Sequence, residues 1–196
     1  MMNTALISAF LTYTLITAIT PGPNNILALS SVSAFGLKRS SRVILGMSVG
    51  FLVIMLLCGL LSYTLINVLP ALTYWMKFVG AAYILWLALK IARSNPNVSS
   101  ASEGLLSFSA SFWLQFANVK IILYGITALT TFVLPTTREI IWVTGASLLL
   151  AVIGVFGNLC WALAGHLFQV LFRRYGRLLN LILAALLVWI AVDMIR

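Results

Sequence analysis

Long uninterrupted runs of hydrophobic residues, separated by short polar stretches, dominate the sequence. Residues 1–37, 43–76 and 140–172 contain no Asp, Glu, Lys or Arg. A helix needs about 20 apolar residues to cross a bilayer, whereas the strands of a membrane barrel alternate apolar and polar residues over about 10 positions. Because the apolar runs here are continuous, the pattern predicts an all-α, polytopic membrane protein.

Six membrane-spanning helices account for these runs. We predict spans over residues 4–34, 43–66, 73–91, 108–134, 140–167 and 178–195, with Pro70 and Pro135 bordering the third and fourth. The first span lacks the positive start and the cleavage site of a signal peptide, so we interpret it as a retained helix.

The composition excludes three other classes of protein. Hydrophobic residues make up 62% of the 196 positions and charged residues only 8%. An ordinary soluble domain has about 25% charged residues. Together with a mean hydropathy of +1.11, this excludes a soluble globular domain, a disordered protein and a disulfide-stapled secreted module.

The positions of the basic residues predict the orientation. The net charge is +9, and Lys and Arg collect in cytoplasmic loops of membrane proteins. The loops after the first, third and fifth spans carry eight of the twelve: Lys38, Arg39, Arg42, Lys90, Arg93, Arg173, Arg174 and Arg177. Only Lys77, Arg138 and Arg196 fall on the other side, which places both termini in the periplasm. No basic helix with interleaved aromatic residues occurs, so nucleic acid is not an expected partner.

We predict a single transmembrane domain, 1–196, which a polar cytoplasmic linker at residues 93–107 divides into halves of three helices, 1–92 and 108–196. Because three is odd, the second half enters the membrane in the opposite direction to the first. This arithmetic predicts a 3+3 inverted repeat, a common transporter architecture. The first span of each half also contains its most polar stretch.

The polar stretch of the first span contains two prolines around a glycine. Proline removes a backbone donor and clashes with the preceding turn, so we predict a break in the helix. Such breaks in apolar helices are typical of transporter binding sites. A surface loop after Thr20 is the alternative, but the apolar run continues to Leu29. The candidate binding residues here are Pro21, Gly22, Pro23, Asn24 and Asn25.

Lys120 lies near the middle of the fourth span, where a charge costs about 2.5–3.5 kcal/mol on insertion scales. No Asp or Glu is expected at this depth, so a substrate carboxylate or the carbonyls of the broken helix would be its partner. A lysine that reaches to the interface, or one that carbonyls cap permanently, is the alternative. Asn118 can hydrogen-bond across helices or line a locally unwound segment.

Other polar residues carry less information. Cys58 and Cys160 form neither a metal motif nor a disulfide framework, and a buried cysteine usually behaves as a small hydrophobe. A membrane thiol-redox protein using both is a distant alternative function. His166 could relay protons or simply lie at the interface. No catalytic arrangement, cofactor loop or metal cluster occurs, so we expect no enzyme, no cofactor and no metal, with transport driven by an ion gradient.

Three motifs resemble the LysE/RhtB family of amino-acid exporters over the full length of the chain. They are Thr20-Pro21-Gly22-Pro23-Asn24, the stretch Gly80–Leu87, and Asn118-Val119-Lys120. Val119 stands where most members have proline, so the resemblance does not by itself imply a proline-driven break in the fourth span.

The resemblance implies a multi-pass exporter of the bacterial inner membrane, driven by the proton gradient as an antiporter. Residues 20–31, 115–135 and 157–169 look closest to members that export cysteine and its precursor O-acetylserine. Homoserine, threonine or leucine are alternative substrates, and uptake or exchange is an alternative direction. In this interpretation Lys120 binds the substrate α-carboxylate, and carbonyls freed at Pro21 and Pro23 accept from the α-ammonium. Glycine-rich helix faces would permit a homodimer.

Overall fold

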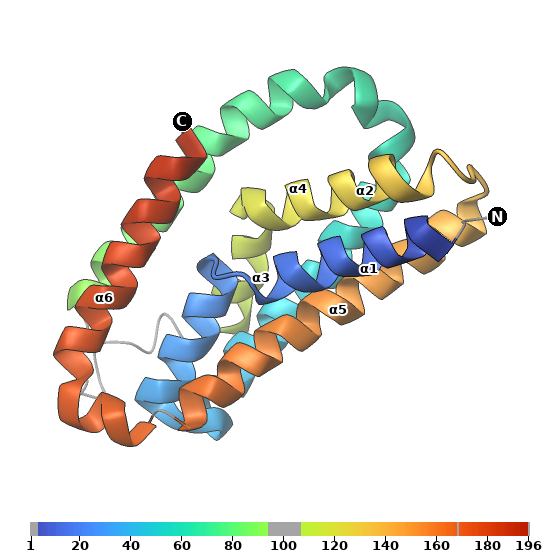
Figure 1. Ribbon diagram of the computed structural model, residues 1–196. Helices are drawn as coiled ribbons and strands as arrows, with labels where there is room; N and C mark the ends of the chain where they lie inside the picture. Colours follow the sequence, from blue (N-terminus) through green and yellow to red (C-terminus); the bar gives the residue numbers. More distant parts are fainter. Residues whose placement is uncertain (1–3, 94–106, 168, 196) are drawn as a thin grey trace.

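The computed structural model describes residues 4–93, 107–167 and 169–195, and within these ranges it contains helices and short connections but no strand. The predicted all-α class is therefore confirmed. The linker predicted at 93–107 lies almost wholly outside the described residues. The helices, shown in Figure 1, are α1 (Thr4–Ile19), α2 (Pro23–Arg93), α3 (Phe108–Ala117), α4 (Val119–Ala128), the π-helix η2 (Leu129–Val133), α5 (Ile140–Leu167) and α6 (Gln169–Ile195).

Helix α2 is much longer than any predicted span because two helical segments follow each other directly, with a single non-helical residue, Gly36, at the kink between them. Gly36 has φ 79° and ψ 164°, a left-handed conformation that glycine adopts without a steric penalty. We expected a loop between residues 34 and 43, and a single glycine makes the turn instead. The ribbon turns again in its teal part, and its green part then arches along the outer edge of the molecule toward α6 (Figure 1).

Several helices are long and apolar enough to cross a membrane. Among the described residues, three pass this test: 23–62, 140–167 and 174–192. A fourth is the pair of helices 108–117 and 119–133, which are bent by 58° relative to each other. Helix α1 is apolar but only 16 residues long. The sixth predicted span begins just after a kink in α6 at Tyr175.

Two apolar clusters hold the helices together, and α2 contributes to both. The first joins α2 to α3, α5 and α6 through buried residues such as Val32, Met47, Leu114, Ala162 and Leu187. The second joins α2 to α1, α4, η2 and α5 through Phe10, Phe51, Met55, Leu129 and Leu150. Helices α3 and α4, which follow each other in the chain, thus pack in different clusters: α3 in the first and α4 in the second.

Glycines on α5 bring this helix against the backbone of its neighbours. A Cβ placed on Gly157 would lie 2.6 Å from the carbonyl oxygen of Ala18, and one on Gly165 would lie 2.5 Å from that of Leu29. The Ser33 hydroxyl donates to the Gly165 carbonyl at 2.9 Å. The small residues of this helix therefore allow it to pack closely against its neighbours.

The same contacts place the basic turns of the chain at one end of the molecule. The Ser33–Gly165 hydrogen bond holds the turn at Gly36 beside the carboxyl end of α5, where α6 begins. Figure 1 shows both at the lower left, while the N-terminus and the connection from η2 to α5 lie at the right. Lys38, just after the turn at Gly36, and Arg174, near the start of α6, therefore lie at the same end of the bundle.

We predict that Gly157→Ala and Gly145→Ala, in the same helix, have opposite effects on stability. No atom lies within 4 Å of a Cβ at Gly145, so alanine there should leave stability unchanged or raise it by up to about 1 kcal/mol. Overpacking against Ala18 should lower the free energy of unfolding of Gly157→Ala by about 1–3 kcal/mol. Thermal unfolding of the detergent-solubilised variants measures this. Equal Tm values for the two would contradict the close approach of α5 and α1.

Candidate functional site

Two helix breaks from opposite halves of the chain meet in the middle of the structure. Helix α1 ends at Ile19 and α2 begins at Pro23, so the break predicted from the prolines is confirmed. The second break separates α3 from α4 at Asn118, which has φ −86° and ψ 89°. This break forms without proline, because Asn118 itself leaves the helical conformation and its N–H bonds to Gln115 instead.

Side chains satisfy the carbonyls that the first break frees. The Asn25 amide donates to the carbonyl oxygens of Ala18 at 3.1 Å and Thr20 at 2.8 Å. The indole N–H of Trp161, on α5, donates to the carbonyl of Ile19 at 2.9 Å. Unsatisfied carbonyls cost several kcal/mol each in an apolar environment, so these bonds stabilise the break.

Lys120 contributes the remaining donor to the first break. Its ammonium lies 2.5 Å from the carbonyl oxygen of Thr20 and 3.4 Å from that of Pro21. Gly22 leaves room for this approach, because a Cβ there would lie 2.8 Å from Lys120 Cδ. An ammonium has three N–H donors, so one remains for another acceptor.

A chain of side-chain amides links the two breaks and has a fixed direction. Gln115 Nε2 donates to the carbonyl of Ser111 at 2.9 Å, and a carbonyl can only accept. The same nitrogen donates to Asn24 Oδ1 at 3.1 Å, and Asn24 Nδ2 returns a bond to Gln115 Oε1 at 2.7 Å. Asn118 Nδ2 donates to Asn24 Oδ1 at 3.0 Å. The Ser111 carbonyl therefore fixes which atom of each amide donates and which accepts, from Gln115 through Asn24 to Asn118.

The direction of these hydrogen bonds leaves an unused acceptor on Asn118, the last amide of the series. Since Asn118 Nδ2 faces Asn24, its Oδ1 points elsewhere, and among the described residues it has no hydrogen-bond partner. Asn118 is only 3% exposed. A buried polar atom without a partner costs about 1–3 kcal/mol, which a ligand that donates a hydrogen bond would recover.

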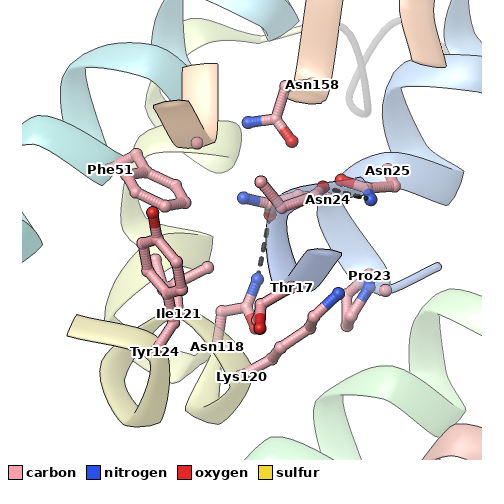
Figure 2. A pocket seen from close by; sticks show the side chains of 13 residues that line it. Thr17, Pro23, Asn24, Asn25, Phe51, Asn118, Lys120, Ile121, Tyr124 and Asn158 are labelled. Atoms are coloured by element: carbon pink, nitrogen blue, oxygen red, sulfur yellow. Dashed lines mark hydrogen bonds between the residues drawn. The ribbon is translucent and has the colours of Figure 1, made fainter. Parts of the chain in front are cut away.

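A cavity of about 340 Å³, including space open to the outside, lies between the breaks. Figure 2 shows how the side chains of α2, α4 and α5 surround it. One wall is aromatic: the rings of Phe51 and Tyr124 meet edge to face at 6.0 Å, and the Tyr124 hydroxyl donates to the Leu150 carbonyl. The lining residues are Thr17, Ala18, Gly22, Pro23, Asn24, Asn25, Phe51, Asn118, Lys120, Ile121, Tyr124, Gly154 and Asn158.

The structure brings together six of the seven candidate binding residues on the wall of this cavity. Pro21 is the exception, since it is exposed and contributes only its carbonyl to Lys120. Neither cysteine lines the cavity and both are free: Cys58 packs in the second apolar cluster and Cys160 is half-buried. His166 is exposed near the end of α5, away from the cavity lining.

Sequence reasoning missed Gln115, Phe51, Tyr124 and Asn158 as site residues. Gln115 and Asn158 carried a usable signal, because an amide within an apolar helix is rare and needs a partner. Phe51 and Tyr124 gave no such signal, because aromatic residues in apolar helices are also common in an ordinary hydrophobic core.

Comparisons with known proteins identify the family of the chain. Residues 15–196 match the family described as LysE type translocator. The chain is 62% identical to the cysteine/O-acetylserine efflux protein of Klebsiella pneumoniae subsp. pneumoniae, over 99% of both chains. It is 61% identical to the proteins of that name from Escherichia coli and Shigella sonnei, over 97% of this chain and 98% of theirs. No solved structure matches it. The chain belongs to the family of LysE type translocators.

Proposed function

We propose that this protein exports cysteine and O-acetylserine, and other small neutral amino acids, across the bacterial inner membrane in exchange for protons. One observation carries the proposal: two helix breaks meet around a cavity lined by an ammonium and an unpartnered amide oxygen. Broken helices that face each other are the usual setting of a transporter binding site. The names of the relatives, cysteine/O-acetylserine efflux proteins, support the choice of substrate.

In this proposal the two charged groups of a zwitterionic amino acid have separate partners. The remaining N–H of Lys120 binds the α-carboxylate. The Pro21 carbonyl, expected to accept from the α-ammonium, already accepts from Lys120. Asn118 Oδ1 is therefore the acceptor that we assign to the α-ammonium, because it has no other partner in the described chain.

The aromatic wall limits the size of the substrate side chain. Phe51 and Tyr124 line the cavity, and a Cβ on Gly154 would overlap the Phe51 ring. The ring therefore occupies the space that a larger residue at position 154 would take. In this proposal the substrate side chain lies against the rings of Phe51 and Tyr124, which favours a small side chain such as that of cysteine or O-acetylserine.

Six spans in a 3+3 inverted repeat, with both termini in the periplasm, complete the proposal. In each half the first span is the broken one, at residues 20–22 and at Asn118. Rocking of one half against the other around such a site would give alternating access. The shared end of the basic turns supports a cytoplasmic position for Lys38 and Arg174.

Lys120→Ala should reduce export to the level of cells that lack the protein. A hydrogen bond to a charged group contributes about 1.5–3 kcal/mol, so a loss of at least about tenfold is expected. Efflux of labelled cysteine from overproducing cells measures it, with the amount of inserted protein quantified in membranes. Lys38→Ala, at the exposed turn, is the matched control and should export normally. Wild-type export by Lys120→Ala would remove this residue from the mechanism.

Gln115→Leu should raise the KM for cysteine several-fold while the protein remains in the membrane. Leucine has a similar size but cannot anchor Asn24 and Asn118, so the acceptor at Asn118 is no longer held in place. Ser109→Leu is the control, because Ser109 is exposed on the same helix and does not line the cavity. An unchanged KM in Gln115→Leu would show that the amide chain does not position the substrate.

The proposed orientation predicts which loops a membrane-impermeant maleimide reaches in intact cells. The background is Cys58→Ser/Cys160→Ser, which should export at the wild-type rate because neither thiol lines the cavity. Added to it, Glu139→Cys should be labelled and Ser41→Cys should be labelled only after lysis. Both positions are exposed. The reverse pattern would overturn the orientation, and loss of export in the background would favour thiol chemistry.

A further inference from the structure

Asn158 is a second buried amide on the cavity wall that neither the breaks nor the amide chain uses. It lies on α5, is 2% exposed, and its Nδ2 has no hydrogen-bond partner among the described residues. Gly157 and Trp161, on the same helix, contact Ala18 and Ile19 of α1 and so account for the packing of α5 against α1. These contacts do not involve the side chain of Asn158. An amide donor held in an apolar helix without a partner costs free energy, so its place on the cavity indicates contact with a ligand.

The position of Asn158 assigns it a particular part of the substrate. Figure 2 shows Asn158 and Lys120 on opposite sides of the cavity, with Asn24 and Asn118 between them. If Lys120 holds the α-carboxylate and Asn118 the α-ammonium, Asn158 faces the substrate side chain. This step rests on the function proposed above.

We infer that Asn158 is a specificity-determining residue that donates a hydrogen bond to an acceptor on the substrate side chain. The ester carbonyl of O-acetylserine is such an acceptor, and an aliphatic side chain of similar length offers none. A site that holds a buried hydrogen-bonding group discriminates against a ligand that leaves this group unpaired. Asn158 thus selects polar side chains over aliphatic ones within the size limit set by Phe51 and Tyr124.

The test uses purified full-length protein in proteoliposomes, with counterflow of labelled cysteine. Unlabelled O-acetylserine and norleucine compete, and the ratio of their half-inhibitory concentrations measures the preference. This ratio does not depend on how tightly each variant binds the label. Wild-type protein should prefer O-acetylserine about three- to tenfold, as expected for one neutral hydrogen bond, and Asn158→Leu should bring the ratio close to one.

Two further variants keep the result interpretable. Asn158→Asp has the same shape but no N–H donor, so it should also lose the preference even if leucine prevents folding. Asn180→Leu makes the same substitution at a buried asparagine of α6 that does not line the cavity, and it should keep the wild-type ratio.

The outcomes separate this inference from the proposed function. If wild-type protein transports cysteine and the ratio is unchanged in Asn158→Leu or Asn158→Asp, the role of Asn158 is overturned while export stands. If wild-type protein transports neither cysteine nor O-acetylserine, the proposed function fails and this inference fails with it. A ratio that falls in the Asn158 variants and not in Asn180→Leu supports the inference.

Discussion

The contact of the Lys120 ammonium with the carbonyls of Thr20 and Pro21 is the constraint on which the site depends. Prolines open the helix, and carbonyls without donors would make the opening costly in an apolar environment. Lys120 reaches them from the other half of the chain, and Gly22 leaves it room. Each break thus depends on the other: the first supplies acceptors for a half-buried charge, and the second places the lysine that carries it.

The sequence predicted those features of the structure that depend on neighbouring residues in the chain. The break at Pro21–Pro23 follows from missing donors and ring clashes, and the carbonyls were one of the two partners predicted for Lys120. Helix content followed from the apolar runs. The positions of the turns could not be predicted from these runs. A single glycine, Gly36, replaces the expected loop, and α2 continues through Pro70 without a break in the helix. An apolar run shows that a chain is helical but not where it reverses.

What could not be predicted depends on contacts between distant segments. Asn118 breaks its helix without proline, and Val119 simply begins the next one. Gln115 becomes an anchor only because Asn24 lies opposite it. Asn158 differs from a packing residue only in what it faces across the cavity. An amide within an apolar helix signals a polar partner, but the partner itself appears only once the helices are packed.

The charges on the cavity wall favour neutral amino acids over basic ones. The lining residues include one cation, Lys120, and no Asp or Glu, while the remaining polar side chains are four amides and the hydroxyls of Thr17 and Tyr124. In the proposed binding mode a zwitterion brings one carboxylate for Lys120 and one ammonium for Asn118, so no charge is left without a partner. A basic amino acid would add a second cation with no counter-ion in a partly desolvated space, where like charges interact strongly.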